Sequence, residues 1–98
     1  MKITIAKNSI NPHYLMTKAG YNAHYNDSYV MRLSGGDYPR FHVYINENNN
    51  GDMVLNLHLD QTKAVNKWMK HAHRGEGDSD VVKQEHDRLV KWINYFKQ

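Results

Sequence analysis

The segments PRFHVYIN at residues 39–46 and MVLNLHLD at residues 53–60 decide the fold of this chain. In both segments apolar residues alternate with polar ones, which is the pattern of a strand with one buried face. The sequence ENNNGD between them is typical of a turn. Together they predict an antiparallel hairpin.

The register of this hairpin follows from matching the apolar faces of its two strands. The match predicts His42 opposite His58 and Arg40 opposite Asp60. Directly opposed residues have Cβ atoms about 4.5–5.5 Å apart. A shift of two residues would keep the faces matched and would place His58 opposite Arg40 instead.

A third alternating segment, residues 28–34, precedes a Gly-Gly-Asp turn. Pairing Leu33 with Phe41 continues the sheet and places Arg32 beside His42. The three strands therefore form an antiparallel meander, which has one face on a core and one face that water reaches.

Helices and loops flank this meander. The sequence predicts a strand at residues 2–6, a helix at 11–18, a loop at 21–27, a helix at 61–70, a loop at 71–78 and a helix after Ser79. Asn11 and Pro12 begin the first helix and Gly20 ends it. The last helix carries an apolar stripe that includes His86 as a hydrogen-bonded core histidine: Val82, His86, Leu89, Ile93 and Phe96.

These elements predict an α+β fold, with a meander sheet of three or four antiparallel strands and helices mainly on one face. The 98 residues fit a single domain, residues 1–98. The chain has no cysteine, which excludes disulfides and thiolate metal sites. No apolar run approaches the roughly 20 residues that span a bilayer. We therefore expect a soluble cytoplasmic protein with no membrane partner.

One candidate site lies on the polar face of the meander. His42 and His58 with Asp60 are the residue types of a two-histidine, one-carboxylate metal site. Alternatively, the two histidines act as acid and base on a phosphate group. Either way Arg32, Arg40 and Tyr44 are the expected ligand-binding residues. An ordinary exposed sheet face with an Arg–Asp pair is the remaining interpretation.

A second candidate site follows in the loop at residues 71–78. His71 and His73 lie on one side of an extended segment, and Glu76 and Asp78 supply oxygen ligands. This set suits zinc, manganese or iron, and a polar loop before a helix is the alternative. Before it, the lysines of residues 61–75, with Arg74 and no acid, form either a phosphate-facing patch or a solvated helix face.

The chain resembles an uncharacterised family of short bacterial proteins, and the likeness is specific in its central third. The shared pattern is YPRFHVY at residues 38–44, LHLDQ at 57–61, and HAH at 71–73 followed by Glu76 and Asp78. The likeness covers roughly residues 12–90 and departs after Gln61, where the family tends to a loop rich in Lys, Pro and Gly. The resemblance implies no reaction, but it implies that the sheet face and the His-x-His loop form one pattern.

Two hypotheses follow from the sequence. The first is a divalent-metal protein acting on phosphate or nucleic-acid ligands; if catalytic, it is a metal-dependent phosphodiester hydrolase. The second is a non-catalytic module, from a phage or mobile element, that binds nucleic acid or inhibits a protein partner. The net charge of +3 is too small to decide between them.

Overall fold

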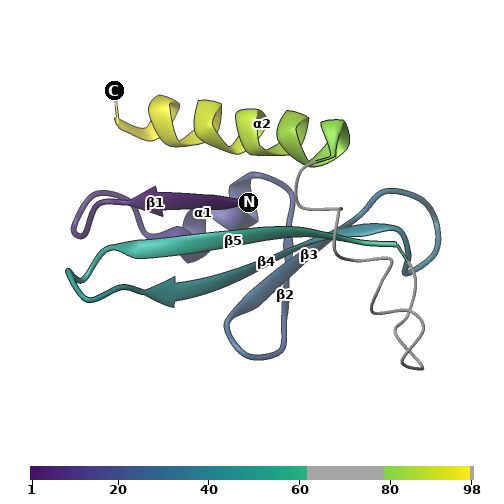
Figure 1. Ribbon diagram of the computed structural model, residues 1–98, viewed down its shortest axis with the longest axis horizontal. Helices are drawn as coiled ribbons and strands as arrows, with labels where there is room; N and C mark the ends of the chain where they lie inside the picture. Colours follow the sequence, from purple (N-terminus) through teal and green to yellow (C-terminus); the bar gives the residue numbers. More distant parts are fainter. Residues whose placement is uncertain (62–78, 98) are drawn as a thin grey trace.

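The computed structural model describes residues 1–61 and 79–97, which form five strands and two helices (Figure 1). In chain order these are β1 (Lys2–Ile5), α1 (Pro12–Lys18), β2 (Asn22–His24), β3 (Ser28–Arg32), β4 (Arg40–Glu47), β5 (Met53–Asp60) and α2 (Asp80–Lys97). The predicted helix at 61–70, the predicted loop at 71–78 and the basic patch within 61–75 lie wholly or almost wholly outside the described residues.

All five strands belong to one antiparallel sheet in the order β1-β5-β4-β3-β2. The α+β class is confirmed, but the expected count of three or four strands is wrong. The extra strand is β2, which lies inside the segment 21–27 that was predicted to be a loop. It was missed because its sequence, Asn-Ala-His, has only three residues and none of the β-branched or aromatic residues that mark a strand.

The register of the β4–β5 hairpin is as predicted, with His42 opposite His58 and Arg40 opposite Asp60. The register of β3 on β4 differs from the prediction by two residues. Val30 lies opposite His42, and Arg32 lies opposite Arg40. The prediction that Arg32 lies beside His42 is therefore wrong. A two-residue shift preserves the match of apolar faces, so alternation alone cannot detect it.

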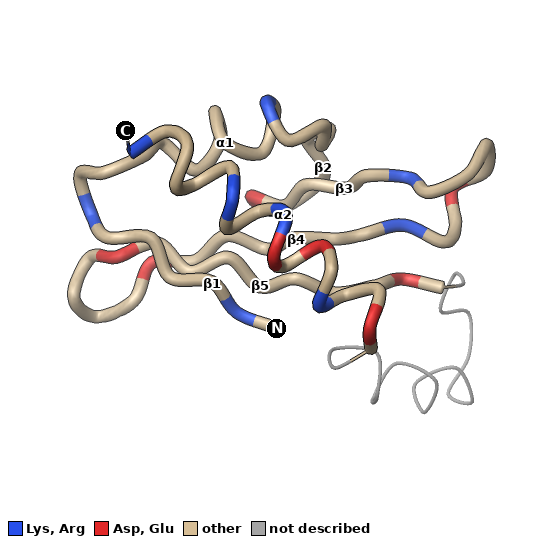
Figure 2. The backbone as a smooth tube through the Cα atoms, turned by 90° about the horizontal axis from the view of Figure 1, so that it is seen from above, with Lys and Arg blue, Asp and Glu red and all other residues tan. Residues whose placement is uncertain are grey.

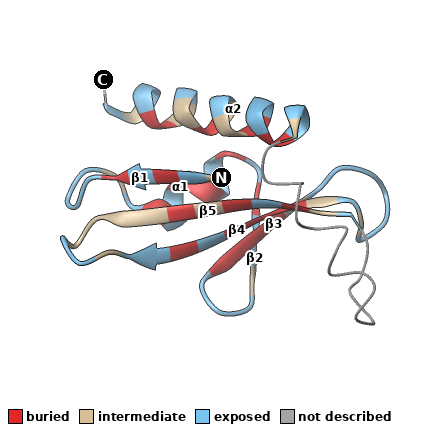
Figure 3. Cartoon of the chain, in the orientation of Figure 1, coloured by how far each residue is buried: buried red, intermediate tan, exposed pale blue. Residues whose placement is uncertain are grey.

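The core fills the space between the helices and one face of the sheet. Buried residues of β4 and β5 on this face are Phe41, Val43, Ile45, Leu55, Leu57 and Leu59. Leu15 and Met16 of α1 and the buried residues of α2 join the same cluster. Figure 3 shows the burial along the underside of α2 and along the sheet. Each such side chain contributes about 1.5–3 kcal/mol when it leaves water.

Both ends of α1 are as predicted. The Asn11 side chain accepts hydrogen bonds from the backbone N–H groups of His13, at 2.8 Å, and Tyr14. At the other end Gly20 has φ +101°, and the N–H of Tyr21 donates to the carbonyl of Met16 at 2.9 Å. This is the Schellman motif, for which glycine is the favoured residue because it has no Cβ.

Helix α2 begins as predicted, but two residues of the predicted stripe, His86 and Phe96, are only partly buried. The Ser79 hydroxyl accepts from the N–H of Val82 at 3.3 Å, which caps the helix. His86, expected in the core, is only half-buried and pairs with Asp87 at 3.1 Å. Glu85 is buried in its place. Within residues 1–61 and 79–97, neither helix has the length and apolar character needed to cross a bilayer.

Candidate functional site

The side of the sheet opposite the helices, here called the open face, is covered by neither α1 nor α2 (Figure 1). The strand pairing places fifteen residues on it: Lys2, Thr4, Asn22, His24, Ser28, Val30, Arg32, Arg40, His42, Tyr44, Asn46, Val54, Asn56, His58 and Asp60. Three of them are Lys or Arg, three are histidine, and Asp60 is the one acid among them. The candidate site is therefore a polar, weakly basic surface.

Five rings run in contact across this face, from the β2–β3 turn to β5. Tyr25 contacts His24 with ring centroids 4.9 Å apart, and His24 meets the edge of His42 at 5.3 Å. His42 and Tyr44 stack at 4.2 Å, and Tyr44 meets His58 at 5.7 Å. We call these five residues the ring row. Its continuity depends on β2, which pairs with β3 and brings the His24 ring against His42 of β4.

A hydrogen-bond network holds the centre of the ring row. His42 is 6% exposed, and its Nδ1 lies 2.9 Å from Oδ2 of Asp60. The Arg40 Nε–H donates to the same oxygen at 3.2 Å. On the other side of the ring, Nε2 lies 3.1 Å from Oγ of Ser28, whose hydroxyl donates to the carbonyl of Tyr25. Both ring nitrogens of His42 are thus engaged.

Both sides of the His42 ring meet polar partners. Ser28 has one hydroxyl proton, which it donates to the Tyr25 carbonyl. Nε2 of His42 lies against that hydroxyl oxygen, and Nδ1 lies against the Asp60 carboxylate. The buried ring is therefore held from both sides, as buried polar groups in proteins generally are.

The charges of the site shift the titration of its members. Burial alone would raise the pKa of Asp60, but hydrogen bonds and charge from His42 and Arg40 outweigh it and hold that pKa below its ordinary value. Burial lowers the pKa of His24, and the charges of Arg40 and His42 lower it further. Burial, followed by the charge of Asp60, raises the pKa of Tyr44. At neutral pH Asp60 is therefore ionised, and Tyr44 is a neutral phenol.

Ser28, His42 and Asp60 follow one another in the order of a hydrolytic triad, with the serine at Nε2 and the acid at Nδ1. A nucleophile must reach its substrate, however, and Ser28 is 1% exposed. Its hydroxyl proton is also committed to the Tyr25 carbonyl. The three residues therefore fix the His42 ring beneath Tyr44 and do not form a nucleophilic site.

The metal-ligand set is not brought together by the described residues. In residues 1–61 and 79–97 no group of three or more His, Asp or Glu side chains is arranged to hold an ion. His42 has neither ring nitrogen available, and His58 is exposed on the other side of Tyr44. The other predicted ligands, His71, His73, Glu76 and Asp78, lie outside the described residues.

The predicted ligand-binding residues separate into two groups. Arg40 and Tyr44 belong to the site, through Asp60 and through the ring row. Arg32 lies at the end of β3, where its guanidinium is 3.7 Å from the exposed carboxylate of Asp37. It is on the open face but two residues away from the position expected beside His42.

Three members of the site, His24, Tyr25 and Ser28, were not predicted from the sequence. Ser28 starts β3, and the shifted register carries it toward His42. His24 reaches the site through β2, whose polar sequence gave no strand signal. The observed register places Ser28 diagonally across from His42. A sequence analysis that used this register would have identified Ser28 as a hydroxyl partner of the histidine.

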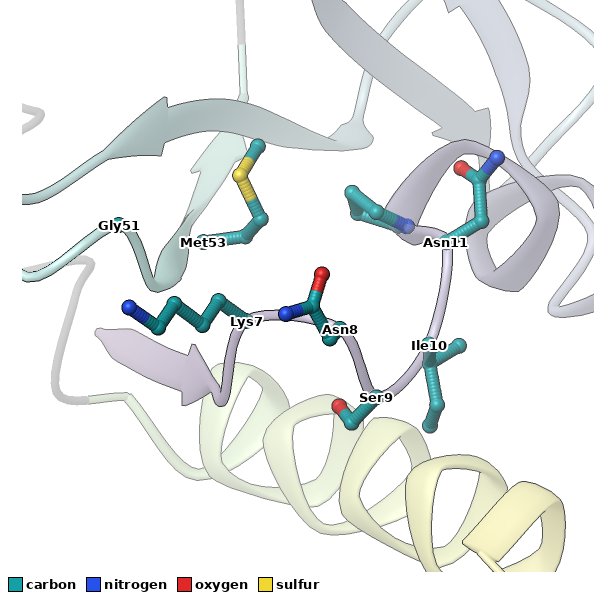
Figure 4. Close-up of a pocket in the computed structure, with 8 residues that line it drawn as sticks. Lys7, Asn8, Ser9, Ile10, Asn11, Gly51 and Met53 are labelled. Atoms are coloured by element: carbon teal, nitrogen blue, oxygen red, sulfur yellow. The ribbon is translucent and has the colours of Figure 1, made fainter.

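A hollow of about 360 Å³ lies away from the open face, between the β1–α1 connection and the β4–β5 turn (Figure 4). Its polar groups are largely committed to the fold. The backbone N–H of Lys7 donates to Asp52 at 3.0 Å, and the Ser9 hydroxyl donates to the Ala6 carbonyl at 2.8 Å. Asn11 caps α1. The hollow is therefore a structural junction, and the open face remains the candidate site.

Comparison with known proteins adds no relative: no family model, no curated protein and no solved structure matches the chain.

Proposed function

We propose that the open face binds single-stranded nucleic acid and that the protein does not cleave it. The observation that carries this proposal is the ring row, which lies on the face that the two helices leave uncovered. Unstacked bases pack on aromatic side chains, each base gaining about 1–3 kcal/mol. A continuous row of rings on a sheet offers several such positions side by side.

The exposed members of the row supply the stacking surface. Tyr25 is 78% exposed and Tyr44 is 39% exposed, and His58 is also exposed. His42 is buried beneath them and supports Tyr44 by stacking on its ring. The exposed rings would contact the ligand, and the buried His42 ring would hold the exposed Tyr44 ring in position.

The charge of the open face suits a phosphate backbone. Lys2 and Arg32 are exposed on opposite sides of the ring row. Asp60, the acid of this face, is already paired with Arg40 and His42. The face therefore carries a net positive charge, although Arg32 also lies 3.7 Å from the exposed Asp37, and phosphate binding to it should weaken as salt rises.

Binding without cleavage fits the chemistry of the centre. Ser28 is buried, and His42 has both nitrogens engaged, so neither group is placed to attack a phosphodiester or to transfer its proton. The proposal does not extend to zinc, manganese or iron, because His42 has no nitrogen available as a ligand. Most of the ring row falls in the motifs that resemble the short bacterial family, and we propose the same binding face for that family.

The test is fluorescence anisotropy with labelled poly-dT and poly-U oligonucleotides of about 20 nucleotides, several times the footprint of one small domain. We expect binding at about 50 mM salt that weakens by 200 mM. Tyr44→Ala and Tyr25→Ala should each weaken binding by about tenfold, the equivalent of one lost stack. Tyr95→Ala, at a tyrosine of α2 whose exposure lies between those of Tyr44 and Tyr25, is the matched control and should leave affinity unchanged.

Two results would overturn the proposal. One is the absence of binding to both oligonucleotides at low salt. The other is binding that Tyr25→Ala leaves intact. Tyr25 is so exposed that its removal should not disturb folding, so its variant remains informative if Tyr44→Ala proves unstable. Release of shortened oligonucleotide during the assay would contradict the claim that the protein does not cleave its ligand.

A further inference from the structure

Four aromatic side chains gather where the C-terminal half of α2 passes α1. Phe96 contacts Tyr14 of α1 at 5.4 Å between ring centroids and stacks on Trp92 at 5.6 Å. Tyr95 meets the edges of Phe96 at 5.5 Å and of Trp92 at 6.0 Å. We call Tyr14, Trp92, Tyr95 and Phe96 the aromatic patch. It belongs to the helix layer and is separate from the open face.

This patch is only partly explained by the core. Trp92 and Phe96 pack against core residues, but Tyr95 is 64% exposed and Tyr14 is 51% exposed. Single exposed aromatics are ordinary on a protein surface, whereas rings that touch one another and face water usually mark an interaction site. Trp, Tyr and Arg are also the residues that most often dominate binding energy at protein interfaces.

The charged residues in the second half of α2 have one sign. The acids of α2 are Asp80, Glu85 and Asp87, and every charged residue of the helix after Asp87 is Lys or Arg (Figure 2). Lys91 lies beside the patch, and the Lys18 ammonium lies 5.5 Å from the centre of the Tyr14 ring. Neither lysine is ion-paired with a carboxylate of the described residues.

A hollow of about 410 Å³ adjoins the patch and is lined in part by Arg88, Lys91, Trp92 and Tyr95. These residues recur every three or four positions and so form one flank of α2. Arg88 is held by Glu85 and by the Ala19 carbonyl, so its guanidinium is fixed in place. Lys91 is the cation of this flank that remains for a ligand.

We infer that this flank of α2 docks an acidic peptide segment of a protein partner, whose apolar side chain enters the hollow while its carboxylates meet Lys91 and Lys18. The combination of an aromatic hollow with unpaired lysines is complementary to such a segment in both shape and charge. A nucleic-acid strand is the competing occupant, and the effect of Tyr95→Ala on oligonucleotide binding tests it. The inference is independent of the proposed function, since it concerns the opposite layer of the fold.

The test uses two labelled synthetic peptides of about 18 residues, or five helical turns. One is amphipathic, with glutamate on one face and leucine and phenylalanine on the other; the second has glutamine in place of each glutamate. We expect the acidic peptide to bind and the glutamine peptide to bind at least about tenfold more weakly. Tyr95→Ala should reduce the affinity for the acidic peptide by at least about tenfold.

Matched variants separate this site from the rest of the surface. Lys91→Glu should abolish the preference for the acidic peptide, whereas Lys83→Glu, in the first half of the same helix, should preserve it. Equal affinity for both peptides, or no loss with Tyr95→Ala, would overturn the inference. So would a loss of oligonucleotide binding with Tyr95→Ala, because the patch would then belong to the nucleic-acid surface. Failure of Tyr44→Ala to affect oligonucleotides would count against the proposed function alone.

Discussion

Tyr21 and Glu85 lie 64 residues apart in the sequence, yet the Tyr21 hydroxyl donates a 2.6 Å hydrogen bond to the Glu85 carboxylate. Both side chains are buried. Arg88 donates to both oxygens of that carboxylate, at 2.7 and 2.8 Å, and to the Ala19 carbonyl. These bonds hold α2 against the end of α1, so they keep both helices on one side of the sheet.

Removing the buried carboxylate should be costly. Glu85→Ala leaves Arg88 and Tyr21 without their acceptor. We expect the free energy of unfolding to fall by about 3 kcal/mol. This is the low end of the range for a broken buried ion pair, because Arg88 is partly exposed. Urea unfolding measures the loss. Asp87→Ala, at an exposed acid of the same helix, should change stability by less than about 0.5 kcal/mol. Equal effects of the two substitutions would show that the buried network contributes nothing.

The turn that delivers Tyr21 to this network depends on Gly20. Its φ of +101° is strained for any residue with a side chain, and an added Cβ would lie 3.4 Å from the Met31 sulfur. Gly20→Ala should therefore destabilise the protein by about 1 kcal/mol or more. Gly35→Ala is the control, because a Cβ there meets nothing within 4 Å. Thermal unfolding of the two variants should differ by several degrees; indistinguishable melting temperatures would contradict the argument.

Alkaline pH should reveal the same network. Burial raises the pKa of Tyr21, and the hydrogen bond and charge of Glu85 raise it further. An unfolded tyrosine ionises near pH 10, so the unfolded state loses a proton there while folded Tyr21 keeps its own. Stability from Tyr21 is thus present below about pH 10 and lost above it. Tyr21→Phe should cost about 1.5–3 kcal/mol at pH 7, with a smaller difference at pH 11; a difference independent of pH would refute this.

The sequence predicted those parts of the fold that depend on local pattern. The alternation in β4 and in β5 favoured the register that is observed, although a two-residue shift would have matched the same faces. On β3 the same reasoning failed by two residues. A two-residue shift keeps the apolar faces matched, so the alternation in β3 did not distinguish the predicted register from the observed one, which places Val30 opposite His42.

Contacts between residues far apart in the sequence determine the features that local sequence patterns did not predict. Positions 85 and 86 both fit the helical spacing between Val82 and Leu89, and hydrophobicity favours histidine over glutamate in a core. The structure buries Glu85 because Tyr21 and Arg88 are there to satisfy its charge. In the candidate site, likewise, the prediction paired His42 with His58 correctly but missed Ser28, which approaches from a strand whose register was wrong.

The clearest test of the site's electrostatics is acid unfolding of Asp60→Asn. Burial alone would raise the pKa of Asp60, yet His42 and Arg40 hold it below its ordinary value. Since an unfolded aspartate titrates near 3.9, its contribution to stability is complete above that pH and is lost as pH falls toward the folded pKa. At neutral pH the carboxylate also satisfies the buried His42 ring, so replacing it with an amide should cost about 1.5–3 kcal/mol.

At pH 3 the same substitution should cost much less, because the unfolded wild-type chain then carries a protonated Asp60 and the advantage of the ionised form shrinks. Urea unfolding at pH 7 and at pH 3 measures both differences. Asp37→Asn provides the matched control: its carboxylate also faces an arginine, but at 3.7 Å and in an exposed pair, and such pairs contribute about 0–1 kcal/mol. If Asp60→Asn were as harmless as Asp37→Asn at pH 7, the network beneath the ring row would not be what holds His42 in place.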